Sequence, residues 1–119
     1  MAHFKSNEGS SKDLIAFRYH GITKENLDRE IEDFFFRRGY KQTGGVLGNV
    51  TYEKGDRTMR ILFGAFIKYF KYKIMTDELR DGEIGLRVIR ATSGFSGGLI
   101  GRDQVTQEMI DIKAGLQII

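Results

Sequence analysis

The sequence contains no cysteine and only two histidines among its 119 residues. Without cysteine there is no disulfide and no thiolate-bound metal, a composition that suits a cytoplasmic location. His3 lies in a polar stretch and His20 at the end of an expected strand. Neither position suggests a metal site or a Ser-His-Asp arrangement. We therefore expect no metal and no cofactor, and we favour a non-catalytic protein over an enzyme.

Long hydrophobic runs are also missing. The longest, residues 61–67, is far shorter than the roughly 20 apolar residues that span a bilayer. Residues 1–12 are polar and have no apolar signal core. We expect a flexible N-terminal tail over 1–12, a single domain over 13–119 and no transmembrane segment.

Charge of either sign is in only slight excess, because the net charge is +3. The excess is unevenly spread: residues 54–90 hold nine Lys and Arg against five Asp and Glu, and the remainder holds ten against eleven. The basic surplus therefore lies in the segment that we expect to form much of the sheet. A solvated face or a binding surface for acidic molecules would each account for it.

Alternating apolar residues between glycine turns predict a series of strands. We expect a tight hairpin at Gly55-Asp56 and a turn or bulge at Gly64-Ala65. The run 66–75, in which lysines alternate with aromatic residues, is expected to be the central strand. The predicted strands are 13–20, 40–47, 50–54, 58–63, 66–75 and 83–91.

A helix is predicted after Thr23, whose hydroxyl can cap the first turn. Leu27, Ile31, Phe34 and Phe35 recur at positions i, i+4, i+7 and i+8, which is the spacing of a buried stripe. Gly39 supplies the residue at which the helix stops. We interpret the stripe as part of the hydrophobic core.

A second helix is predicted after Asp103, which we take as its cap, with Val105, Met109, Ile112 and Leu116 on its buried side. The glycine-rich residues 94–101 precede it. They lack the Gly-Lys-Ser/Thr and G-x-G-x-x-G patterns of phosphate-binding loops. We therefore interpret them as a flexible crossover.

This element order predicts an α+β fold, β-α-β(4-5)-α, with an antiparallel sheet and both helices on one face. It is similar in element order to the TATA-binding-protein-like arrangement and, more distantly, to the helix-grip ligand-binding folds. The resemblance implies this architecture only, because no sequence motif accompanies it.

The alternation in 66–75 and 83–91 predicts which side chains point away from the helices. The inner face would carry Phe70, Tyr72 and Ile74, and the outer face would be basic. Its predicted binding residues are Arg60, Tyr69, Lys71, Lys73 and Arg87. Basic side chains neutralise phosphates or carboxylates, and tyrosine rings stack on bases. The leading hypothesis is a binding module for nucleic acid or an acidic protein.

Two alternatives stay open. A small hydrophobic ligand or lipid could bind between the sheet and the helices. Its predicted pocket residues are Phe34, Phe35, Phe70, Tyr72, Phe95 and Met109. Alternatively, apolar side chains on the outer face, including Leu62 and Ile89, could make the protein a homodimer that associates through its sheet.

Overall fold

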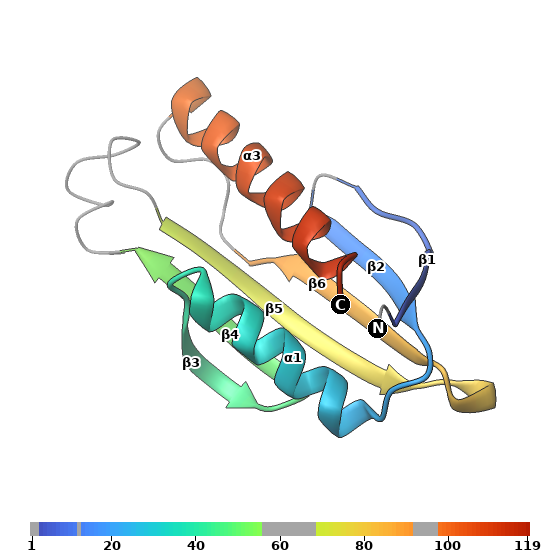
Figure 1. Ribbon diagram of the computed structural model, residues 1–119. Helices are drawn as coiled ribbons and strands as arrows, with labels where there is room; N and C mark the ends of the chain where they lie inside the picture. The colour runs from blue at the N-terminus through green and yellow to red at the C-terminus, as the bar shows by residue number, and fades with distance from the viewer. Residues whose placement is uncertain (1–2, 12, 56–68, 92–97) are drawn as a thin grey trace.

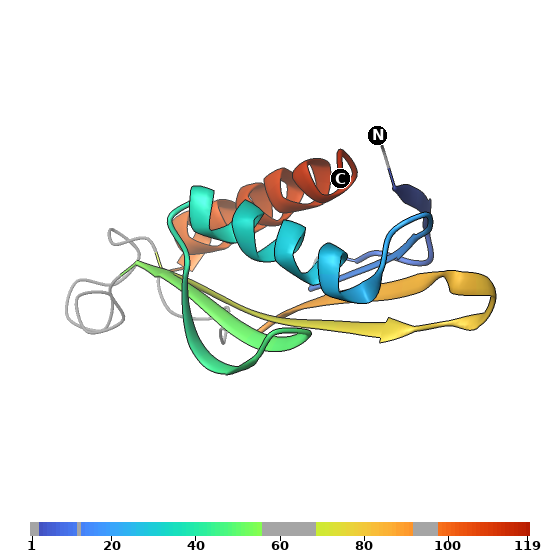
Figure 2. The same cartoon turned by 60° about the horizontal axis from the view of Figure 1, so that its bottom comes forward.

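The computed structural model describes residues 3–11, 13–55, 69–91 and 98–119, with the backbone alone at residue 69 and at residues 98–105. These residues form a six-stranded antiparallel sheet and two α-helices, an α+β architecture. The strand order is β1-β2-β6-β5-β4-β3, so β5 and β6 form the middle of the sheet. Both helices lie on the same side of the sheet, which we call the inner face (Figures 1 and 2).

The strands pair in two antiparallel groups of three, which meet at β5 and β6. β1 (Phe4–Asn7) pairs with β2 (Leu14–Tyr19), and β2 pairs with β6 (Ile84–Arg90). β3 (Lys41–Val46) pairs with β4 (Asn49–Gly55), which pairs with β5 (Tyr69–Glu78). A short 3-10 turn, η2 (Arg80–Gly82), leads from β5 into β6. The predicted strand 58–63, the Gly55-Asp56 hairpin and the break at Gly64-Ala65 lie partly or wholly outside the described residues.

Helix α1 (Lys24–Arg37) begins and ends at the residues that its sequence signals predict. The Thr23 hydroxyl accepts a hydrogen bond from the backbone N–H of Asn26 at 3.1 Å. Leu27, Ile31 and Phe35 are buried along one stripe of the helix. The positive φ of 90° at Gly39 lets the chain turn back into β3.

Helix α3 (Gly98–Leu116) begins earlier than the sequence predicts. Asp103 was expected to cap it, but this residue lies inside the helix, and the last residues of the supposed crossover are helical. Glycine costs a helix only about 1 kcal/mol relative to alanine, so a glycine-rich passage does not by itself prevent helix formation. Met109, Ile112 and Leu116 are buried as predicted.

The N-terminal segment also differs from its expectation. Residues 4–7 were expected to belong to a flexible tail, but they form the edge strand β1. The Phe4 ring packs edge-on against Phe17 of β2, with 4.8 Å between ring centroids. The backbone N–H groups of His3 and Phe4 both donate to the Ile119 oxygen, at 2.7 and 3.0 Å. The Phe4 ring and these long-range backbone hydrogen bonds hold the segment in the sheet. Its polar composition does not predict that it forms a strand.

The inner face is the hydrophobic core. Alternation along β5 buries Phe70, Tyr72 and Ile74, and alternation along β6 buries Ile84, Leu86 and Val88. Ile74 lies directly opposite Val88 in the sheet. The Phe35 ring of α1 stacks on Tyr52 of β4, with 4.9 Å between centroids. The side chains between these buried positions point to the opposite, outer face.

Candidate functional site: the outer face of the sheet

The outer face lies on the side of the sheet away from α1 and α3 (Figure 2). Strand register places its residues in continuous rows. Leu14 of β2 lies opposite Ile89 of β6, and Ile89 lies opposite Lys73 of β5. In the next row Ala16 lies opposite Arg87, and Arg87 lies opposite Met75. Because paired residues point to the same side of a sheet, these side chains form one contiguous surface.

Apolar side chains occupy the middle of this surface. Leu14, Ala16, Met75 and Ile89 are each half-buried, although no helix of the described chain covers them. We call these four residues the apolar strip. Lys71 and Lys73 flank the strip along β5, and Arg87 lies within its second row. A partner that contacts the strip would therefore also meet positive charge.

Part of the positive charge on the outer face is compensated. Arg87 lies 3.4 Å from a carboxylate oxygen of Asp77, and both side chains are more than half exposed. Glu53 of β4 lies opposite Lys71 and also has an interaction partner. Exposed pairs of this kind contribute little to stability and exchange readily with water. Lys73 is exposed and lies opposite the uncharged Ile89 and Thr51.

The structure brings together three of the five predicted outer-face residues. Lys71, Lys73 and Arg87 lie on neighbouring strands and point away from the helices. Arg60 lies outside the described residues. Tyr69 begins β5, but only its backbone is described. The other four tyrosines, Tyr19, Tyr40, Tyr52 and Tyr72, are all buried on the inner face.

The predicted pocket residues lie mostly in the core. Phe35, Phe70, Tyr72 and Met109 are buried, and the half-buried Phe34 ring contacts Phe35 with 5.3 Å between centroids. Phe95 lies outside the described residues. Two open clefts lie on the surface, and Phe34 lines the smaller of them. One, of about 700 Å³, lies between the start of α1 and the β5–β6 turn, and one of about 410 Å³ separates α1 from the end of α3.

A buried polar group between the helices and the sheet was not predicted from the sequence. Glu108 of α3 accepts a hydrogen bond from the Tyr40 hydroxyl at 2.5 Å and forms an ion pair with Arg38. Burial, and then the hydrogen bond to Glu108, raise the pKa of Tyr40 well above its usual range. Glu108 and Tyr40 are 68 positions apart. Only the tertiary fold brings them together, so no local sequence signal marked the pair.

A second buried carboxylate joins α1 to the sheet. Asp28 accepts a hydrogen bond from the Thr76 hydroxyl of β5 at 2.5 Å and pairs with Lys24 at 3.0 Å. Gly48 of the β3–β4 turn lies against this pair with φ at +93°, and a Cβ there would lie 2.5 Å from the Lys24 nitrogen. The carboxylate, the strand and the turn therefore form one packed unit.

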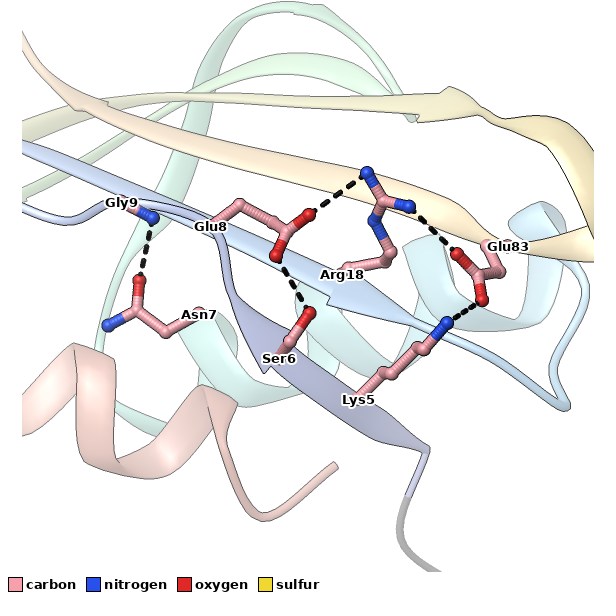
Figure 3. A network of polar contacts seen from close by, with 7 residues as sticks. All are labelled: Lys5, Ser6, Asn7, Glu8, Gly9, Arg18 and Glu83. Carbon is pink, nitrogen blue, oxygen red and sulfur yellow. Dashed lines mark hydrogen bonds and ion pairs between the residues drawn. The ribbon is translucent and has the colours of Figure 1, made fainter.

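A surface network ties β1 to the centre of the sheet. Figure 3 shows the Arg18 guanidinium between Glu8, at 2.9 Å, and Glu83, at 3.0 Å. Glu83 also pairs with Lys5 of β1. The hydrogen bonds from Lys5 and Arg18 lower the pKa of Glu83. This arrangement connects structural elements, and it leaves the Arg18 charge largely neutralised.

Metal ligands do not gather in the described part of the chain: no group of three or more His, Asp or Glu side chains there could hold an ion. None of the helices in the described ranges combines the length and the apolar character needed to cross a bilayer. A scan against protein-family models and searches of curated proteins and of solved structures found no match to this chain.

Proposed function

We propose that the protein is a non-catalytic binding module whose outer sheet face binds an acidic segment of a partner protein. One observation carries the proposal: both helices lie on the inner face, while Lys71 and Lys73 flank the half-buried apolar strip on the outer face. Exposed apolar surface rimmed by charge is a frequent property of protein-binding sites. Positive charge next to it selects acidic partners and speeds their association.

The apolar strip favours a protein partner over nucleic acid. Phosphate and sugar groups offer little apolar surface to Leu14 or Ile89, whereas the aliphatic side chains of a peptide would cover both. Single-stranded nucleic acid is usually held by stacking its bases on aromatic rings. Tyr69 is the one tyrosine that alternation assigns to this face, and its side chain is not described. Nucleic acid is therefore the second candidate.

Self-association and binding of a hydrophobic ligand are the two alternatives to this proposal. Association of two copies through the apolar strip is a competing use of the same surface. A hydrophobic-ligand pocket would need the stacked rings of Phe35 and Tyr52 to move apart. The resemblance in element order to TATA-binding-protein-like and helix-grip folds supplies no binding residue. A cytoplasmic location depends on the cysteine-free composition alone.

The proposal is tested by titrating the labelled protein with a synthetic peptide that alternates glutamate and leucine, and separately with a single-stranded oligonucleotide. We expect the peptide to shift the backbone amide signals of β5 and β6. Its affinity should fall as salt screens the charges. In the Lys71→Glu, Lys73→Glu variant, binding should weaken by on the order of tenfold to hundredfold, because two attractive contacts become repulsive.

The matched control is the Arg29→Glu, Lys113→Glu variant, which changes net charge equally but on the helices. It should bind the peptide nearly as well as the wild-type protein does. Equal affinity in the wild-type protein and the lysine variant would refute the outer-face proposal. Binding of the oligonucleotide but not of the peptide would replace the acidic protein with nucleic acid. Sedimentation of the free protein as a dimer that the peptide does not dissociate would favour self-association.

A further inference from the structure

The inner face contains a group of polar side chains that the proposed function does not use. Arg38, Tyr40, Tyr72, Arg90 and Glu108 come together near the end of α1, where β5 and β6 face α3. We call these five residues the polar cluster. Tyr72 lies directly opposite Arg90 in the sheet, and the Tyr40 and Tyr72 ring centroids are 5.9 Å apart.

Among the described residues, three hydrogen-bonding atoms of the polar cluster are buried without a partner. They are the Tyr72 hydroxyl and the Nε atoms of Arg38 and Arg90. Tyr40 is close enough to Tyr72 for its hydroxyl to lower the Tyr72 pKa, but the pair does not meet the distance and angle criteria of a hydrogen bond. Buried polar groups in folded proteins nearly always have a partner, and an unpaired one costs about 1–3 kcal/mol. Three such atoms in one region therefore need a physical explanation.

All three atoms can donate a hydrogen bond, and the two Nε–H groups can only donate. What they lack in common is an acceptor. Burial raises the pKa of Tyr72, and the Glu108 charge raises it further, so the hydroxyl stays protonated. The nearby Arg90 and Arg38 charges act in the opposite direction on Tyr72. Both arginines therefore lie close enough to influence whatever the Tyr72 hydroxyl contacts.

Both guanidinium groups of the polar cluster pair with a carboxylate through a terminal nitrogen, which leaves each Nε–H available for a further acceptor. Arg38 already neutralises Glu108, and Arg90 lies 2.7 Å from Asp13. Asp111 approaches Arg38 only at 4.0 Å and is half exposed. Lys54 adds a further positive charge, 5.6 Å from the centre of the Tyr40 ring. The Arg38 and Arg90 side chains are partly exposed, at 27% and 19%, whereas their Nε atoms are buried.

We infer that the polar cluster is a binding site for a small oxyanion, a carboxylate or a phosphate group, that accepts hydrogen bonds from Tyr72, Arg38 and Arg90. Arginine suits this ligand because its planar guanidinium keeps its charge and donates in fixed directions. The Tyr72 hydroxyl adds a neutral donor from the floor of the site. The site lies on the inner face, so its occupant does not compete with a partner on the outer face.

Tyr52 provides a matched control, because it lies directly opposite Tyr72 in the sheet. Its hydroxyl is also buried, and no described residue is its hydrogen-bond partner. Its surroundings, however, are acidic: burial, Glu32 and Asp28 raise its pKa to about 12. An anion would be repelled there. The two neighbouring tyrosines thus share burial and an unpaired hydroxyl, and they differ in the sign of the charge around them.

The test is an amide-shift titration of the full chain with sodium acetate and, separately, with inorganic phosphate, at constant ionic strength balanced with chloride. We expect at least one of the two anions to give saturable shifts around Arg38, Tyr72 and Arg90. The Tyr72→Phe variant keeps the ring and should bind that anion on the order of tenfold to hundredfold more weakly. The Tyr52→Phe variant should bind it as the wild-type protein does.

A second variant covers the case in which Tyr72→Phe does not fold. Arg90→Lys keeps the charge beside Asp13 but removes the Nε–H, and it should also weaken binding. Saturation by acetate alone would identify the group as a carboxylate, and saturation by phosphate alone would identify it as a phosphate. No saturable shift with either anion would overturn the inference, as would equal affinities of the wild-type protein and Tyr72→Phe. The unpaired donors would then contact water only.

Discussion

The two helices each bring one buried carboxylate to the sheet, and the two carboxylates are held in different ways. Asp28 of α1 is 6% exposed and Glu108 of α3 is 7% exposed. Each accepts a hydrogen bond of 2.5 Å from a hydroxyl, that of Thr76 for Asp28 and that of Tyr40 for Glu108. Each also pairs with one cation.

The origin of the cation is the difference. Lys24 pairs with Asp28 from one turn earlier in the same helix, so this ion pair forms whenever α1 forms. Arg38 comes from the residue after α1, 70 positions before Glu108. The Glu108 pair therefore exists only when α3 is docked against α1 and the start of β3. We infer that Asp28 fastens a helix that is already specified locally, whereas Glu108 helps to specify where α3 lies.

The largest effect should come from removing the non-local carboxylate. Glu108→Ala leaves Arg38 and Tyr40 without their shared acceptor in a largely buried region. Breaking one side of a buried ion pair typically destabilises a protein by 3–5 kcal/mol, and the partial exposure of Arg38 places this change near the lower limit. We expect a loss of about 3 kcal/mol in the free energy of unfolding, measured with urea.

Asp111→Ala is the control for this prediction. It removes a carboxylate from the same helix and from the same arginine, but at 4.0 Å and with the side chain 45% exposed. Its cost should stay below about 1 kcal/mol. Similar losses in both variants would mean that the burial of Glu108 adds nothing to the free energy of unfolding. The inference that Glu108 specifies the position of α3 would then be wrong.

A smaller effect is expected on the α1 side. Thr76→Val removes the hydroxyl that donates to Asp28 and keeps a side chain of the same shape. Lys24 still pairs with the carboxylate, so the expected loss is about 1–2 kcal/mol in the same urea experiment. Thr51→Val changes a half-buried threonine on the outer face and should alter stability by less than about 0.5 kcal/mol. A Thr76→Val protein as stable as the wild type would show that Lys24 alone satisfies Asp28.

The same division between local and non-local signals decided what the sequence could predict. Helix α1 was predicted because Thr23, the apolar stripe and Gly39 are all signals within a few residues of one another. The faces of β5 and β6 were predicted because alternation needs no knowledge of the partner strand. Lys71, Lys73 and Arg87 could therefore be assigned to the outer face before their neighbours were known.

What the sequence could not supply were contacts between distant segments. The edge strand β1 depends on the contact between the Phe4 and Phe17 rings and on backbone hydrogen bonds to Ile119. The polar sequence of this segment predicts neither contact. The polar cluster forms only when α3 packs so that Glu108 reaches Tyr40. Their separation in the sequence does not indicate that the two residues are close in space. The early start of α3 was missed because the glycine-rich residues 94–101 were interpreted as a flexible crossover, although glycine costs a helix only about 1 kcal/mol.

The smallest effect concerns Glu83, whose side chain is 13% exposed and pairs with two cations that are 45% and 36% exposed, whereas each buried carboxylate has one close cation. Lys5 and then Arg18 lower the pKa of Glu83 below its ordinary value of 4.5. The folded protein therefore releases this proton more readily than the unfolded chain does. The resulting stability is present above about pH 4.5 and is lost as the pH falls through the lower, folded-state pKa. Glu83→Gln should remove this contribution, so that stability declines less steeply with acid below about pH 4.5.

Urea unfolding midpoints measured from neutral to acid pH check this expectation, with Glu78→Gln as the control. Glu78 is exposed at the end of β5 and has no ion pair among the described residues, so its variant should follow the wild-type acid profile. If Glu83→Gln also follows that profile, the ion pairs of Figure 3 contribute nothing measurable. We expect Glu83→Gln to cost less than Glu108→Ala at neutral pH, because water can replace a lost partner at a more exposed site. Equal losses in the two variants would mean that the number of ion-pair partners, and not burial, determines the loss of stability.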